Sequence, residues 1–180
     1  MTPAQHRAVR PYGEALQQLA AGEGGEAEMW KDLESLAQLW DQLPELDRLL
    51  THPGVAPQVK DAFLVAALTE KVHPYVLNAV RLLVRRGRAS LVPALRTCFL
   101  QVTEERGSLV RVVVRTARPL PPAGQDELAR RLAGALGRPV ALEVEEQPEL
   151  LAGAELEVAG RRLDATVAGR LSRLAAQLRG

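Results

Sequence analysis

Apolar residues recur at every third or fourth position along the first 105 residues of the chain, which is the period of an α-helix. Prolines that suit a first helical turn and glycines that suit the position after a last turn separate the apolar stretches. Links as short as these favour a compact bundle. The pattern predicts six helices, over residues 4–20, 26–43, 44–50, 57–70, 73–86 and 90–105.

After Gly107 the apolar period changes to two, which is typical of β-strands. Strands are expected within 109–117 and over 140–145, with a helix between them over 120–137. In the first of these strands Arg111 and Arg115 fall on one face and valines on the other, so one face is expected to be buried and one hydrated.

A hairpin that turns at Ala159-Gly160 and a final helix are expected to complete the second half of the chain. The apolar stripe of that helix consists of Val167, Leu171, Leu174 and Leu178. The stripe either covers the sheet or takes part in contact with a partner.

The fold class predicted from these patterns is α+β with two domains. A six-helix bundle is expected at residues 1–106, and a small α/β domain with a strand-helix-strand unit, a hairpin and a last helix at 107–180.

The composition, with 47% hydrophobic and 25% charged residues, is that of a globular protein. The longest apolar run is residues 63–68, far shorter than the roughly 20 residues of a membrane-spanning helix, and no signal-peptide pattern is seen, so no direct membrane insertion is expected. A net charge of +1 gives no general attraction to nucleic acid. The single cysteine, Cys98, lies at helical spacing among apolar residues and is expected in the core.

Motifs for chemistry are missing from the chain. The three histidines, His6, His52 and His73, do not have metal-ligand spacing, and the sequence contains no nucleophile, phosphate-loop or zinc-protease motif. We therefore expect no enzyme activity, no metal and no cofactor.

The most basic run, residues 81–88, leaves an alternative open: an RNA-binding accessory factor that uses Arg81, Arg85, Arg86 and Arg88. Aromatic residues that would stack on bases are not interleaved with these arginines. Cations near a helix C-terminus are also favoured by the helix dipole alone, so a hydrated helix end is the preferred interpretation.

The helix that contains residues 75–84 is more apolar than one buried face requires. Beside its core stripe it carries a second stripe of Tyr75, Ala79 and Leu82. Such a helix is either central in its bundle or one wall of a groove that binds an amphipathic helix of another protein, and the pattern alone favours neither.

Three stretches resemble a known family. They are "RPYGEALQQLA" at 10–20, "LNAVRLLVRRGRASLVPAL" at 77–95 and "PELLAGAELEVAGRRLDATVAGRLSRL" at 148–174. They are similar to the opening, middle and closing motifs of the delta subunit of rotary ATP synthases, called oligomycin-sensitivity-conferring protein in mitochondria. Gly13 stands where the family usually has alanine, and Pro11 leaves the register of the first helix open.

The resemblance implies a stator subunit without an active site of its own, at the cytoplasmic face of the bacterial plasma membrane and peripheral through its complex. Its bundle is expected to receive the amino-terminal helix of an alpha subunit in a groove between the first and fifth helices. The carboxy-terminal domain is expected to bind the b subunits of the peripheral stalk. Outside the complex a monomer is expected, with no nucleic acid partner.

The expected contact residues follow from the matched motifs. For the alpha subunit, the resemblance assigns Tyr12, Ala15, Leu16, Leu19, Asn78, Leu82 and Arg85, and the second stripe of the fifth helix adds Tyr75 and Ala79. For the stalk, the expected residues are Val167, Leu171 and Leu174.

Overall fold

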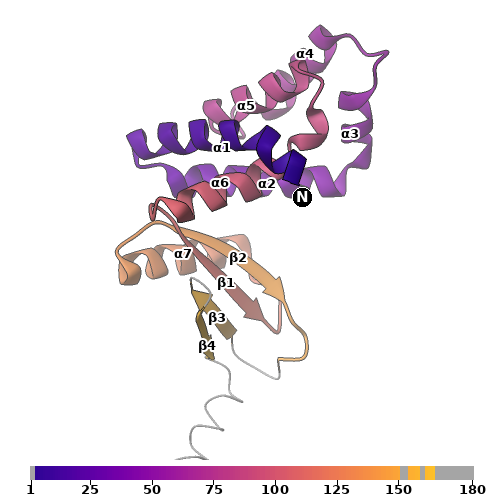
Figure 1. Ribbon diagram of the computed structural model, residues 1–180. Helices are drawn as coiled ribbons and strands as arrows, with labels where there is room; N and C mark the ends of the chain where they lie inside the picture. Colours follow the sequence, from indigo (N-terminus) through magenta and orange to yellow (C-terminus); the bar gives the residue numbers. More distant parts are fainter. Residues whose placement is uncertain (1–2, 151–153, 159–160, 165–180) are drawn as a thin grey trace, which may run out of the picture. The chain divides into compact units, whose positions relative to one another are not determined.

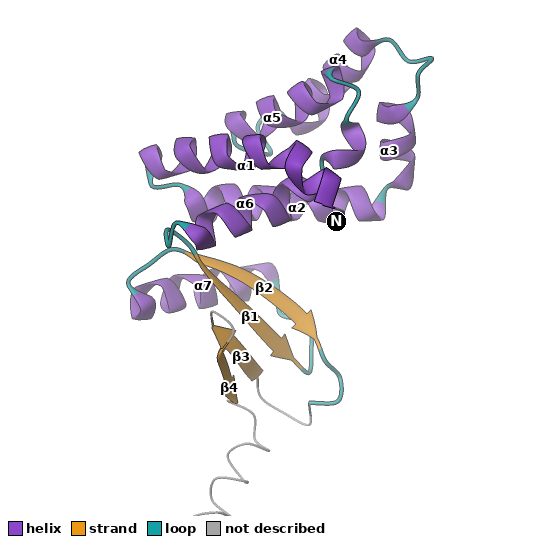
Figure 2. Cartoon of the chain, viewed as in Figure 1, coloured by secondary structure: helices purple, strands orange, loops and turns teal. Residues whose placement is uncertain are grey.

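The computed structural model describes residues 3–150, 154–158 and 161–164. The chain divides into two compact units, Met1–Ser108 and Leu109–Gly180. The first is helical and the second contains the sheet, as the colouring in Figure 2 shows.

The described residues of the helical unit form six α-helices and one 3₁₀ turn (Figure 1). They are α1 (Pro3–Glu23), α2 (Glu26–Gln42), α3 (Pro44–Thr51), α4 (Pro57–Leu68), α5 (Pro74–Arg85), η1 (Ala89–Leu91) and α6 (Ala94–Glu105). The predicted number of helices is confirmed, and α1 continues through Pro11 without a break.

The sixth helix begins later than the expected residue 90. Pro93 has no N–H with which to bond the carbonyl of Ala89, so a continuous α-helix would lack that bond. The Ala89 carbonyl instead accepts a bond from Val92 N at 2.9 Å, which closes the 3₁₀ turn before α6 starts.

The core of the helical unit consists of large aliphatic side chains with a few aromatic ones. Both tryptophans of the chain, Trp30 and Trp40, lie on α2 and are buried. The largest fully buried side chains come from several helices and include Phe99, Met29, Leu33, Leu50, Leu64, Leu83 and Leu95.

Helix α1 packs most extensively on α6. Where the two helices meet, a Cβ atom added to Gly13 would lie 2.8 Å from Cys98 Sγ, so the glycine permits this approach. Cys98 is fully buried, as predicted, and burial raises the pKa of its thiol to about 11.

The described residues of the second unit form a four-stranded sheet in the order β2-β1-β3-β4. Strand β1 (Val110–Thr116) is followed by helix α7 (Pro122–Leu136) and by β2 (Val140–Glu146), which pairs parallel to β1. Strands β3 (Ala154–Val158) and β4 (Arg161–Asp164) form an antiparallel hairpin, and β3 also pairs antiparallel with β1. The predicted strand-helix-strand unit and hairpin are therefore present.

Helix α7 covers one face of this sheet, where Val112, Val114 and Val140 form the buried cluster. Leu128 and Leu132 of the helix pack against that cluster. Figure 1 shows α7 lying along the sheet. The period-two pattern thus placed Val112 and Val114 of β1 correctly.

The opposite face of the sheet is hydrated only in part: Arg111 and Glu145 are exposed, as expected. Val113 and Ala141 on this face are buried, although Arg111 lies beside them. Ion pairs between neighbouring strands lie on this face: Arg111 Nη2 lies 2.6 Å from Glu143 Oε2, and Arg115 reaches three carboxylates. The distances from Arg115 are 2.8 Å to Glu145, 3.0 Å to Glu155 and 3.1 Å to Glu157. The predicted last helix falls in 165–180, outside the described residues.

Candidate functional site

Helices α1 and α5 lie side by side in the helical unit, and a hydrogen bond joins them near each end of α5. At one end the Arg86 Nη1 group, just after α5, donates a hydrogen bond to the Tyr12 hydroxyl at 2.9 Å. At the other end the Tyr75 hydroxyl donates to Glu23 Oε1 at 3.0 Å. Tyr12, the earlier of the two residues on α1, is bonded at the end of α5, and Glu23, the last residue of α1, is bonded near its start. The two helices therefore run antiparallel.

The residues expected to contact an alpha subunit are divided between the surface and the core. Leu19 and Leu82, with 42% and 41% of their surface exposed, are large apolar side chains in contact with solvent. The exposed members together are called the α1–α5 face: Ala15, Leu19, Asn78, Leu82 and Arg85. Tyr75 is half-buried, and Tyr12, Leu16 and Ala79 are buried.

Helix α5 is central in the bundle, the first of the two alternatives that its sequence left open: it contacts α1, α2 and α4, and Val76, Val80 and Leu83 are fully buried. Of its second stripe, Ala79 joins the core and Leu82 remains at the surface. An exposed leucine on a helix that is otherwise packed is compatible with contact by a partner helix.

The start of α5 is held by a polar cluster that the sequence did not reveal. The backbone N–H of His73 donates to Asp32 Oδ2 at 2.6 Å, and His73 Nδ1 accepts a bond from Tyr75 N at 3.3 Å, which caps the helix. Burial raises the pKa of Asp32, and the bond to the Glu23 carboxylate raises the pKa of Tyr75. The position of His73 directly before Pro74 is the one feature of the sequence that marks this cap.

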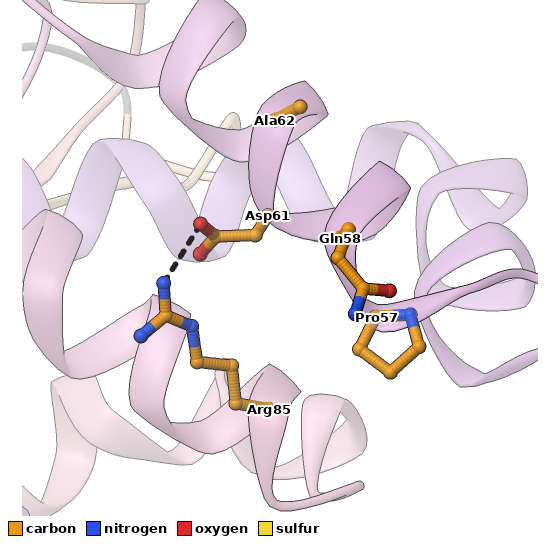
Figure 3. A pocket seen from close by; sticks show the side chains of 5 residues that line it. All are labelled: Pro57, Gln58, Asp61, Ala62 and Arg85. Atoms are coloured by element: carbon orange, nitrogen blue, oxygen red, sulfur yellow. Dashed lines mark hydrogen bonds and ion pairs between the residues drawn. The ribbon is translucent and has the colours of Figure 1, made fainter.

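Asp61 of α4 joins α4 to α5. Its carboxylate accepts bonds from Arg81 at 2.7 and 2.8 Å and from Arg85 at 2.9 Å, and these two guanidinium groups hold its pKa well below its usual range. Figure 3 shows Arg85 pointing at Asp61 across a surface hollow that Pro57 and Gln58 help to line.

This pairing bears on the basic run at 81–88. Two of its four arginines share the Asp61 carboxylate, and Arg86 is bonded to Tyr12. Asp61 therefore offsets one of the four positive charges of the run, and the Tyr12 hydroxyl orients Arg86 without changing its charge.

Three further expectations concern metals, membrane-spanning helices and the stalk. Within 3–150, 154–158 and 161–164, no group of three or more His, Cys, Asp or Glu side chains could hold a metal ion. In the same part of the chain, every helix is too short or too polar to cross a membrane. The residues expected at the stalk, Val167, Leu171 and Leu174, lie outside the described residues.

Comparison with known proteins identifies the class. The model of the ATP synthase delta (OSCP) subunit family matches residues 8–178. ATP synthase subunit delta of Synechococcus sp. (strain JA-2-3B'a(2-13)) is 31% identical over 173 residues, which cover 96% of this chain and 95% of the relative. ATP synthase subunit delta 1 of Syntrophotalea carbinolica is 34% identical over 175 residues, covering 94% and 95%. Such proteins are non-catalytic structural subunits of a rotary ATP synthase.

A solved structure agrees in fold. A chain of the cryo-EM structure of the Toxoplasma gondii mitochondrial ATP synthase hexamer matches with a TM-score of 0.52 and 24% identity, covering 100% of this chain and 99% of that chain. The chain described here belongs to the ATP synthase delta (OSCP) subunit family and is a stator component of an F-type ATP synthase.

Proposed function

We propose that this subunit tethers the catalytic head of the ATP synthase to the peripheral stalk and so resists the torque of the rotor. Family membership over residues 8–178 carries this proposal. The head would follow the turning rotor unless it were held from outside. Two moderate interfaces on one molecule suffice for this, because the first contact raises the effective concentration of the second.

The proposed contact with the head is the amino-terminal helix of an alpha subunit, bound at the α1–α5 face. Leu19 and Leu82 support this assignment, since both are apolar and exposed and belong to adjacent helices. An amphipathic helix would bury these side chains with its own apolar stripe. Three of the expected contact residues are already buried and would contribute indirectly, by keeping α1 and α5 packed against each other: Tyr12, Leu16 and Ala79.

The proposed contact with the stalk is the second unit, through Val167, Leu171 and Leu174, which would meet the b subunits. The bacterial relatives support a location at the cytoplasmic face of the bacterial plasma membrane, reached through the complex. Outside the complex we propose a monomer.

Isothermal titration with a peptide of the cognate alpha-subunit amino terminus, at two salt concentrations, tests the contact with the head. We expect one-to-one binding that changes little with salt. Leu82→Asp should abolish it without changing the circular dichroism spectrum, because Leu82 is at the surface. Val59→Asp is the matched control, since Val59 on α4 is 58% exposed.

Two results would contradict the proposal. Equal loss of binding in both variants would show that the α1–α5 face has no special role. Binding that weakens steeply with salt would instead indicate a contact dominated by the arginines at 81–88.

For the stalk, Leu171→Asp should weaken capture by the soluble part of the b subunits and leave peptide binding unchanged.

A further inference from the structure

Gln17 of α1 is a buried polar side chain whose bonds lead to the end of the helical unit. It is 3% exposed. Its Oε1 atom accepts a hydrogen bond from Arg106 Nη1, and its Nε2 group lies 3.5 Å from the Ser108 hydroxyl. Both partners follow the last residue of α6, so one side chain of α1 reaches the segment where the chain leaves the bundle.

That segment is closed by backbone bonds and is short. Gly107 has a left-handed φ of 66° and its N–H donates to the Glu104 carbonyl at 3.0 Å. The Ser108 N–H donates to the Thr103 carbonyl at 3.0 Å, which completes a Schellman cap. Strand β1 begins at Val110, so only Leu109 lies between the cap and the sheet.

Position on α1 gives this contact a second property. Residues two apart on an α-helix point about 200° away from each other. Gln17 therefore lies on the side of α1 opposite to Ala15 and Leu19, which are exposed members of the α1–α5 face. Helix α1 thus contacts the segment that follows α6 on one side and carries its part of the α1–α5 face on the other.

We propose that Gln17 is a positioning residue that binds the end of α6 to α1, so that the helical unit stays folded up to Ser108 when the second unit is pulled. Helix ends fray readily, because the bonds of the last turn are the weakest in the helix. That the second unit is pulled at all rests on the proposed tether function. The hydrogen bonds of Gln17 do not depend on which partner the protein binds.

Amide hydrogen exchange of the full chain tests the proposal. In Gln17→Met, which keeps the volume and removes both bonds, Gly107 and Ser108 should exchange about tenfold faster or more, the factor that loss of a bond to a charged group produces. Gln18→Met is the matched control, because Gln18 is the exposed neighbour on the same helix. Gln17→Glu retains an acceptor for Arg106 and should restore slow exchange.

Other outcomes would overturn the inference. Unchanged exchange in Gln17→Met would show that the Schellman cap alone holds the end of α6. Equally fast exchange throughout the bundle would show that Gln17 is an ordinary core residue. If Gln17→Met does not fold, Arg106→Met, altered at an exposed position, must give the same local acceleration. Titration of the same samples with the alpha peptide tests the proposed tether separately. Loss of peptide binding would contradict the tether, whereas unchanged exchange in Gln17→Met would contradict the role of Gln17.

Discussion

At the scale of single residues, Gly13 and Cys98 meet where α1 packs against α6, and no room is left for a Cβ atom at position 13. The added Cβ atom of an alanine would approach Cys98 Sγ to 2.8 Å and the backbone atoms Cys98 C and Phe99 N to 3.3 Å. Real Cβ atoms essentially never come as close as the first of these distances. A residue with low helix propensity is therefore retained here for packing.

Gly13→Ala should destabilise the protein by about 1–2 kcal/mol, although alanine is the better helix former, because overpacking outweighs the propensity gain. In the Cys98→Ala background the same change should cost less, since the sulfur is gone and only the contacts of 3.3 Å with backbone atoms remain. Chemical denaturation of the four proteins of this cycle measures the coupling. As a control, Gly22→Ala on the same helix faces open space and should be stabilising. Additive effects of the two substitutions would contradict the packing argument.

Cys98 also predicts a dependence on pH. Burial raises the pKa of its thiol from the ordinary value of 9.0 to about 11. Between these values the unfolded chain loses a proton that the folded protein keeps, so the free energy of unfolding falls as the pH rises. Wild type should lose about 1.4 kcal/mol per pH unit more than Cys98→Ala over this window. Parallel curves for the two proteins, measured by urea titration, would show that the thiol is not desolvated.

At the scale of elements, α4 is held to α5 by one carboxylate with two guanidinium groups. Arg81 approaches Asp61 with two of its nitrogens, a geometry that fixes direction as well as distance. Without Asp61, Arg81 and Arg85 would repel each other, because they lie one turn apart on the same face. The pairing therefore aligns α4 with α5 and reduces the repulsion between Arg81 and Arg85.

Asp61→Asn should remove an acid-sensitive part of the stability. The pKa of Asp61 is lowered in the folded protein, so its contribution is present above the unfolded pKa, near 3.8, and is lost as the pH falls below it. Between pH 7 and pH 3 wild type should lose more stability than Asp61→Asn, as measured by guanidinium denaturation. Asp41→Asn, changed at an exposed position on α2, should follow wild type. Identical acid profiles for all three proteins would disprove the role of Asp61.

Several elements could be predicted from the sequence because their cause is local. Helical period, proline at first turns and glycine after last turns marked α1 to α5, and the alternation of valine and arginine marked β1. Contacts between distant residues could not be predicted in this way. Asp61 and Arg81 are 20 positions apart, and Gln17 and Arg106 are 89 apart, so only the folded bundle brings them together.

The candidate site shows the same division. The sequence indicated an extra apolar stripe on α5, and Leu82 is indeed exposed. It could not show that Ala79 and Tyr12 are buried, because their burial depends on how closely α1 approaches α5. The burial of Val113 and Ala141 was not predicted either, because alternation marks this whole face as hydrated and does not show which of its positions the fold buries.

At the scale of the whole molecule, each unit has a buried core of its own. The cluster beneath α7, with Val112, Val114 and Val140, is built from residues of the second unit. The helical unit buries residues such as Phe99 and Leu33. Two cores of this kind allow each unit to unfold as a separate cooperative step.

Calorimetry of the full chain should therefore show two transitions. A fragment of residues 1–108 should melt cooperatively and reproduce one of them, because it keeps all the helix-to-helix contacts of its unit. A single transition in the full chain, together with an unfolded fragment, would show that the helical unit depends on the rest of the protein.

The placement of the aromatic residues has an optical consequence. Both tryptophans, both tyrosines and both phenylalanines lie within residues 1–108, and Trp30 and Trp40 are buried on α2. Intrinsic fluorescence and the near-ultraviolet spectrum therefore report on the helical unit alone, while the sheet is spectroscopically silent at those wavelengths. A tryptophan introduced on the solvent side of α7, for example at Arg130, would give the second unit a reporter of its own.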